Sequence, residues 1–209
     1  MPSSNTPHHQ WYNTLLTIEE AVEKFTDRDE ALKKLVPLLS REEFRGKYNA
    51  CLVHRHLILQ PGERMVATEL ITQPEKFTAV SDTPNIVPSA WTAKGIPFEW
   101  KRVKGSEEII AAPPPELIKE FLEVVGEGSL LGLSLVLDPV PEGQIWSESI
   151  DRDKRQHILE IKPMAGPQGE QDKVFETCWT PKPSGGQAEP SLVFVLSMTC
   201  TCTCMSCTK

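Results

Sequence analysis

The sequence predicts a single α+β domain in which N-terminal helices and one mid-chain helix pack on a mostly antiparallel sheet of seven or eight strands. Apolar residues recur at helical spacing before residue 48, and strand-like segments dominate after residue 129. Helices first and strands later are typical of α+β proteins. The 209 residues fit one domain, residues 11–198, with a disordered leader, residues 1–10, and a Cys/Thr-rich tail, residues 199–209.

The helices are predicted from capping residues and proline positions. Thr17 and Glu20 have the form of a capping box, which opens the first helix. A second helix is expected from Asp27, and Pro37 should end or kink it because proline lacks the backbone N–H. Residues 116–125 follow three prolines and precede a glycine, so they are expected to form the amphipathic mid-chain helix.

The strands are predicted from β-forming residues and turn signals. Residues 49–59 and 64–71 are expected to form a hairpin around the turn at residues 60–63. Residues 73–96 are rich in proline and threonine and are expected to form a long loop, followed by a strand at residues 97–103. Further strands are expected at residues 130–137, 144–148, 157–162, 173–179 and 192–198.

Composition excludes several classes of partner and location. The formal net charge of −7 is spread along the chain without a basic stripe, which argues against binding to nucleic acid. The longest apolar runs, residues 129–137 and 191–198, are too short for a transmembrane segment, and residues 1–10 lack the apolar region of a signal peptide. We therefore expect a cytoplasmic protein with reduced thiols. Its oligomeric state is not determined by the sequence.

Two histidines in the expected hairpin are candidate catalytic residues. His54 and His56 lie two residues apart, hence on one face of a strand. With a four-residue turn at residues 60–63, the register of the hairpin places His54 opposite Glu69. Two histidines and a carboxylate are the donors of a facial triad for Fe(II) or a similar metal, and a His–carboxylate pair could serve as a general base. The alternative is a half-buried histidine pair with a cross-strand charge partner.

The end of the chain holds four of the six cysteines, Cys200, Cys202, Cys204 and Cys207. Four thiolates could bind Zn or another divalent metal in one tetrahedral site. Cysteines beside an apolar segment could also be palmitoylated. A third interpretation is structural, since the first three cysteines continue the alternation of the strand at residues 192–198 and would pack as small apolar residues.

A resemblance adds a biological setting but no site. Residues 48–56, with Gly62, Glu63 and residues 65–68 after them, resemble segments of small fungal proteins of unassigned function. Residues 176–179 and the Cys-rich end are similar too. The resemblance covers residue 48 onward. It implies an accessory role beside a secondary-metabolite pathway, and it assigns no residue a role.

Three functions follow as alternatives. The first is a soluble accessory or small-molecule-binding protein of a fungal secondary-metabolite pathway, with a pocket between the sheet and the helix at residues 116–125. The second is an enzyme that uses the histidine hairpin, with or without a metal. The third is a thiolate metal-binding protein that uses the tail. Cys178 with His157 is a further candidate nucleophile, although a cysteine within an apolar strand commonly serves packing.

Overall fold

The computed structural model describes residues 6–77, 85–104, 112–163, 173–181 and 192–200. Within these residues it contains four helices and ten strands, which confirms the α+β class and exceeds the expected seven or eight strands. The helices are α1 (His8–Tyr12), α2 (Ile18–Lys24), α3 (Arg28–Leu39) and α4 (Pro115–Val125). The strands are β1 (Tyr48–Leu52), β2 (Glu63–Thr68), β3 (Ile71–Lys76), β4 (Ile86–Thr92), β5 (Pro97–Arg102), β6 (Leu131–Leu135), β7 (Gln144–Asp151), β8 (Gln156–Pro163), β9 (Lys173–Pro181) and β10 (Leu192–Cys200).

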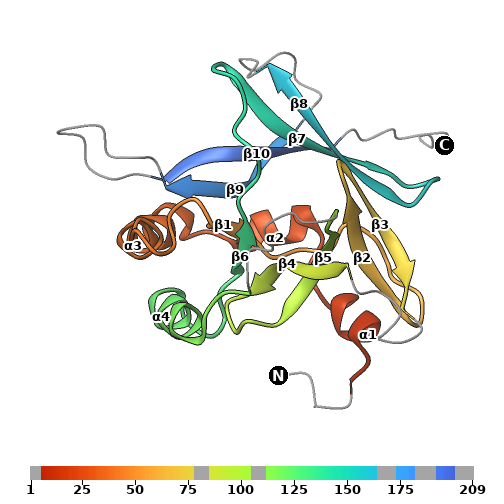
Figure 1. Ribbon diagram of the computed structural model, residues 1–209, viewed down its shortest axis with the longest axis horizontal. Helices are drawn as coiled ribbons and strands as arrows, with labels where there is room; N and C mark the ends of the chain where they lie inside the picture. Colours follow the sequence, from red (N-terminus) through yellow and green to blue (C-terminus); the bar gives the residue numbers. More distant parts are fainter. Residues whose placement is uncertain (1–5, 78–84, 105–111, 164–172, 182–191, 201–209) are drawn as a thin grey trace, which may run out of the picture.

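The ten strands form one strongly curled sheet that closes into a barrel (Figure 1). Their order is β1-β6-β4-β5-β2-β3-β8-β7-β10-β9, and β9 pairs back to β1 through Ala50↔Trp179 and Cys51↔Cys178. Strands β2 and β5 are parallel, as are β7 and β10. The remaining pairs are antiparallel, so the sheet is mixed rather than antiparallel throughout.

The predicted helix signals are confirmed at the start of α2 and at α4. The backbone N–H of Glu20 donates to the Thr17 hydroxyl at 3.3 Å, and the Thr17 N–H donates to the Glu20 carboxylate at 2.8 Å. Helix α3 does not end at Pro37, one of the two effects expected of this proline, because it continues to Leu39. Pro37 is exposed while both neighbours, Val36 and Leu38, are buried, so packing of the apolar face holds the last turn in place.

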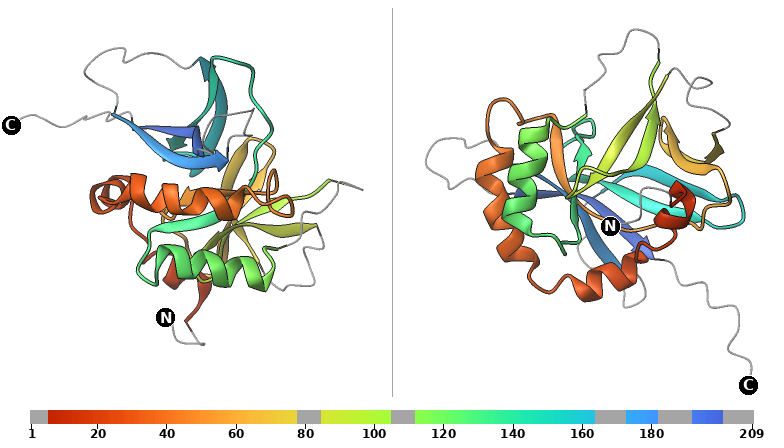
Figure 2. Two further views of the ribbon diagram at one scale, coloured as in Figure 1. Left: turned by 90° about the vertical axis from the view of Figure 1, so that its left-hand side faces the viewer. Right: turned by 90° about the horizontal axis from the view of Figure 1, so that it is seen from below.

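Helices α3 and α4 lie side by side over β1 and β6 (Figure 2). Arg41, just after α3, makes a bidentate ion pair with Glu120 of α4, with N–O distances of 2.9 and 2.5 Å. Beneath them lies the main apolar core, to which β1 and β6 also contribute. Its members include Leu35, Leu39, Ala50, Leu52, Leu117, Phe121, Leu131 and Leu133.

Strand β1 is buried on both faces, which explains why its partners differ from those expected. Ala50 and Leu52 belong to the core under the helices, whereas Cys51 belongs to a second apolar cluster inside the barrel. A strand with two buried faces sits in the middle of a sheet, and β1 pairs with β6 and β9.

The expected hairpin between residues 49–59 and 64–71 does not form. Strand β1 ends at Leu52, the following residues run to β2 without strand pairing, and β2 pairs with β3 and β5. The expected loop at residues 73–96 is also wrong, since most of β3 and all of β4 lie there. The other expected strands are confirmed, each within a few residues of its predicted ends.

The two ends of the chain depart from expectation or fall outside the description. Helix α1 begins at His8, so the last residues of the expected disordered leader are helical, and residues 1–5 lie outside the described residues. Cys200 is the final residue of β10, and Cys202, Cys204 and Cys207 also lie outside the described residues. In the part of the chain that the structure covers, no helix has the length and apolarity needed to cross a membrane.

Candidate metal centre

A cavity of about 410 Å³ lies inside the barrel. Nine of the ten strands contribute to its wall, which combines apolar side chains with a cluster of polar ones. This cavity is not the pocket expected between the sheet and α4, because no residue of α4 lines it and the α4 side of the sheet is filled by the main core. The polar cluster consists of His54, His56, Glu99, Glu148 and His157.

The segment 53–61 carries both histidines and is fixed through its backbone rather than through strand pairing. The N–H of Arg55 donates to the carbonyl of Leu16 at 2.8 Å. The N–H of His56 donates to the hydroxyl of buried Tyr12 at 3.1 Å. The N-terminal residues therefore hold the histidine segment against the barrel, and α1 is part of the site's framework.

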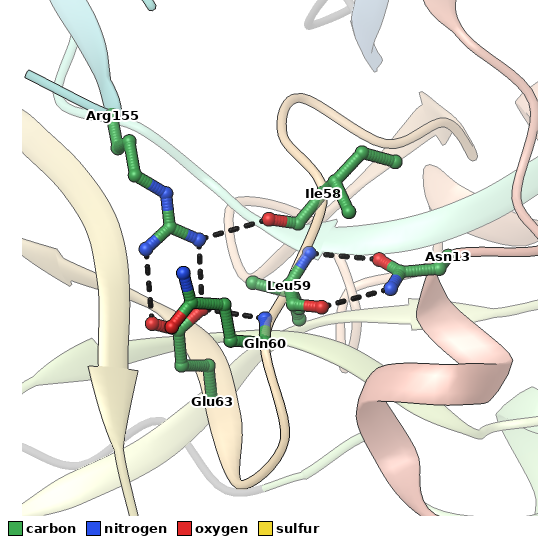
Figure 3. A network of polar contacts seen from close by, with 6 residues as sticks. All are labelled: Asn13, Ile58, Leu59, Gln60, Glu63 and Arg155. Carbon is green, nitrogen blue, oxygen red and sulfur yellow. Dashed lines mark hydrogen bonds and ion pairs between the residues drawn. The ribbon is translucent and has the colours of Figure 1, made fainter. Parts of the chain in front are cut away.

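The far end of this segment is held by the network in Figure 3. The side-chain amide of Asn13 makes two hydrogen bonds with the backbone of Leu59. Its Oδ1 accepts from the Leu59 N–H at 2.8 Å, and its Nδ2 donates to the Leu59 carbonyl at 2.9 Å. Arg155 donates to both carboxylate oxygens of Glu63, at 3.0 and 2.8 Å, and to the carbonyl of Ile58 at 2.9 Å. This ion pair between buried Glu63 and partly exposed Arg155, with both carboxylate oxygens bonded, fixes the turn into β2 relative to the β7–β8 turn.

His54 is 4% exposed, and one of its two ring nitrogens has a hydrogen-bond partner. Its Nδ1 lies 2.8 Å from the carbonyl oxygen of Leu52, and a carbonyl can only accept, so Nδ1 carries the proton. The opposite nitrogen, Nε2, is buried and makes no hydrogen bond with any described residue. Burial lowers the pKa of His54 to about 4, so the ring is neutral at pH 7 and Nε2 presents a lone pair.

His56 repeats this pattern with a carboxylate as its partner. Its Nε2 lies 2.9 Å from Oε1 of Glu99 on β5, and its buried Nδ1 makes no hydrogen bond within the described chain. Burial alone would lower the pKa of His56, but the Glu99 carboxylate outweighs it and raises the pKa above the usual value. Burial acts to raise the pKa of Glu99, and the adjacent His56 reverses that effect and lowers it.

Glu148 of β7 is the third member of the cluster and is 4% exposed. The Thr177 hydroxyl donates to its Oε1 at 3.5 Å, and its Oε2 lies 3.6 Å from Nε2 of His157 on β8. Burial opposes ionisation, yet the interaction with His157 prevails and lowers the pKa of Glu148 to about 2. Glu148 is therefore a carboxylate at neutral pH.

These three residues together form a possible metal site. One ligand atom from each of His54, His56 and Glu148 can be chosen so that all lie within 4.8 Å of one another. Bonds of about 2.1 Å to a divalent first-row metal place its ligand atoms about 3–4 Å apart, so modest side-chain rotations would bring the set onto one ion. Two histidines and one carboxylate are the protein ligands of mononuclear Fe(II) and of many catalytic Zn(II) centres.

The structure brings together only part of the site expected from the sequence. His54 and His56 are in the cluster, but Glu69 is not their partner. Glu69 lies in the β2–β3 turn, its side chain is 67% exposed, and it pairs with Lys104 at the outer end of the cavity. Glu99 and Glu148 are the carboxylates that lie beside the two histidines instead. One feature of the sequence could have identified Glu148 as a buried residue. It lies two positions after Trp146, so it shares that residue's buried face of the strand.

Cys178 and His157 both line the cavity, as the nucleophile hypothesis requires, but the thiol is not activated. The Sγ of Cys178 lies 3.6 Å from the Ser134 hydroxyl, and Cys51 is directly opposite on β1. Burial raises the pKa of Cys178 to about 11, so the thiol remains protonated at pH 7. These cysteines contribute packing to the cavity wall.

Fold and site together define a mixed β-barrel protein with a buried histidine–carboxylate cluster at its internal cavity. No protein-family model matches the chain, and it matches neither a curated protein nor a solved structure.

Proposed function

We propose that this protein is a metal-dependent enzyme that acts on a small molecule held in the barrel cavity. His54, His56 and Glu148 would bind one divalent ion. The observation that carries the proposal is the state of the two histidine rings: each has one nitrogen facing an acceptor and the opposite nitrogen buried without a hydrogen bond.

This arrangement is unfavourable without a ligand, because burying an unpaired polar nitrogen costs about 1–3 kcal/mol. Metal-bound histidines commonly donate their other N–H to a carbonyl or carboxylate, which fixes the tautomer and ring orientation. Here the Leu52 carbonyl serves His54 and the Glu99 carboxylate serves His56. Glu148 is similarly held by Thr177 and lies beside His157. Each proposed ligand thus has the outer partner that a metal site requires.

The bound ion would act as a Lewis acid toward an oxygen atom of the small molecule or toward water. Three protein ligands leave coordination positions open, and the cavity next to them has room for a small organic molecule. The Glu99 carboxylate would stabilise positive charge on His56, and His157 would be available to receive or deliver a proton near Glu148. The donor set suits Zn(II) and Fe(II), and metal content distinguishes them.

The test is metal analysis of the purified, reduced protein. The chain is stripped with chelator, reloaded anaerobically with Zn(II) or Fe(II), desalted and measured by mass spectrometry. One equivalent per chain is expected, with loss in His54→Asn and Glu148→Gln. Glu69→Gln is the matched control and should bind the full equivalent.

A chain lacking residues 201–209, with Cys200→Ser, tests the alternative thiolate site in the tail. It should retain the metal if the barrel site is correct. Metal that is lost from this chain and retained by the His54 and Glu148 variants would overturn the proposal in favour of the tail.

A second candidate is an accessory protein that binds a small molecule without converting it, as in the fungal secondary-metabolite setting that the resemblance implies. The cavity inside the barrel favours it independently of any metal. Under this alternative, His54→Asn and His56→Asn would leave the pathway product unchanged in cells. A loss of product in both variants, with folded protein present, would exclude it.

A further inference from the structure

Lys101 is a cation on the cavity wall that has no acidic partner among the described residues. It lies two residues after Glu99 on β5, so both side chains project from the same side of the strand, and both line the cavity. Lys101 is half-buried and makes no hydrogen bond or ion pair with any residue that the structure describes. The two neighbouring cations do have carboxylate partners: Arg102 pairs with Glu75 at 2.6 Å, and Lys104 pairs with Glu69.

The carboxylates of the polar cluster pair with histidines rather than with this lysine. Glu99 is engaged by His56, and Glu148 lies beside His157. Two acidic residues also line the outer part of the cavity, but Glu69 is paired with Lys104, and Asp138 is exposed to water, which screens its charge. A half-buried ammonium group is therefore left on the wall without an anion from the described part of the chain, and it would favour an anionic ligand.

The remainder of the cavity wall is largely apolar. The side chains concerned are Phe98, Leu135, Leu137, Trp146 and Leu159. The indole N–H of Trp146 is already used, donating to the carbonyl of Asp138 at 2.9 Å, so this ring offers the cavity only apolar surface. A ligand that fits this wall has an apolar body and one anionic group.

We propose that the cavity binds an organic acid, with its carboxylate or equivalent anion on Lys101 and its apolar body against the wall around Trp146. Residues two apart on a strand are separated by about 7 Å, so a ligand held at Lys101 would lie within the length of a small molecule from the His54–His56–Glu148 centre. This inference names the substrate class of the proposed enzyme. The metal chemistry rests on that proposal, whereas the anion site is testable without it.

The experiment compares two fluorescent probes that differ by one anionic group, 8-anilinonaphthalene-1-sulfonate and uncharged N-phenyl-1-naphthylamine. Both are titrated into zinc-loaded protein and into chelator-treated protein. We expect the sulfonate to bind more tightly, and Lys101→Met to weaken it about tenfold, as loss of one charge-assisted contact does. The neutral probe should bind the unmodified protein and the Lys101→Met variant with equal affinity. The Lys101→Arg variant should retain most of the affinity for the sulfonate. Lys119→Met, an exposed lysine on α4, is the matched control.

Equal affinity for the two probes, equal weakening of both by Lys101→Met, or no binding of the sulfonate would each overturn the organic-acid proposal. The proposed metal site fails by a different result, absence of bound metal. A chain that holds no metal but selects the sulfonate through Lys101 keeps the anion site and loses the metal chemistry. A chain that holds metal but does not discriminate between the probes keeps the proposed metal site and loses the anion site.

Discussion

The imidazole of His157 stacks on the imidazole of His56, with ring centroids 4.0 Å apart and planes 13° apart. Each ring has its own carboxylate, Glu99 for His56 and Glu148 for His157. The stacked rings therefore bring both carboxylates to one pair of imidazoles, next to the proposed metal centre.

The contact between Glu99 and His56 predicts a specific effect on metal binding. Glu99→Gln keeps the size of the side chain but removes the charge that makes His56 a stronger donor. We expect metal affinity to fall about 10–100-fold, as for other outer partners of metal-bound histidines. Competition with a chromophoric chelator measures it. Glu75→Gln, which removes a carboxylate paired with Arg102 outside the cluster, should leave the affinity unchanged. Equal losses in the two variants would contradict the role of Glu99.

His54 predicts the acid sensitivity of the metal-free protein. Its pKa is about 4 in the folded chain against an ordinary value of 6.5. The stability it contributes is complete above pH 6.5 and is lost as pH falls toward 4, because the unfolded chain binds a proton that the folded chain does not. The loss approaches about 3 kcal/mol if this shift acts alone.

Urea denaturation of chelator-treated protein between pH 7.5 and 4 measures this dependence. His54→Asn should flatten it, and His9→Asn, in α1, should not. His56 acts in the opposite direction, because its raised pKa contributes stability that is lost as pH rises. An unchanged slope in His54→Asn would rule out a neutral buried His54.

Arg155 predicts a link between stability and the position of the histidine segment. Arg155→Met leaves the buried Glu63 carboxylate without its cation and frees the carbonyl of Ile58. We expect a loss of about 2 kcal/mol in the free energy of unfolding, together with weaker metal binding. Lys154→Met, at the adjacent and exposed position, should cost much less. Normal metal affinity in Arg155→Met would show that this network stabilises the fold without positioning the site.

Gly132 predicts a steric limit on the wall of the barrel. A Cβ at this position would lie 2.2 Å from the carbonyl oxygen of Trp91 and 2.8 Å from Cγ2 of Val53. Because the first of these atoms belongs to the backbone of β4, Gly132→Ala should force β4 and β6 apart and cost about 3 kcal/mol. Gly128→Ala, where a Cβ would meet nothing within 4 Å, is the control for urea denaturation. Equal stability of the two variants would contradict this close approach.

Local signals in the sequence were sufficient for most helices and strands. The capping box at Thr17 and the prolines before α4 act within a few residues, and both helices begin where these signals indicate, to within a residue. Helix α3 does not end at Pro37, because the cost of a helical proline is local, whereas the buried residues around it retain the helix through contacts with other elements.

The sequence by itself located most of the strands, though not β3 and β4, and it indicated His54 and His56 as candidate site residues. Only the tertiary structure decided their partners. Side-chain alternation indicates which residues share a face of a strand, but it does not indicate which strand lies alongside. Strand β1 pairs with β6 and β9 rather than with β2, so Glu69 remains at the exposed turn. Closure of the barrel instead brings in Glu99 and Glu148 from β5 and β7, through long-range pairings that no local pattern specifies.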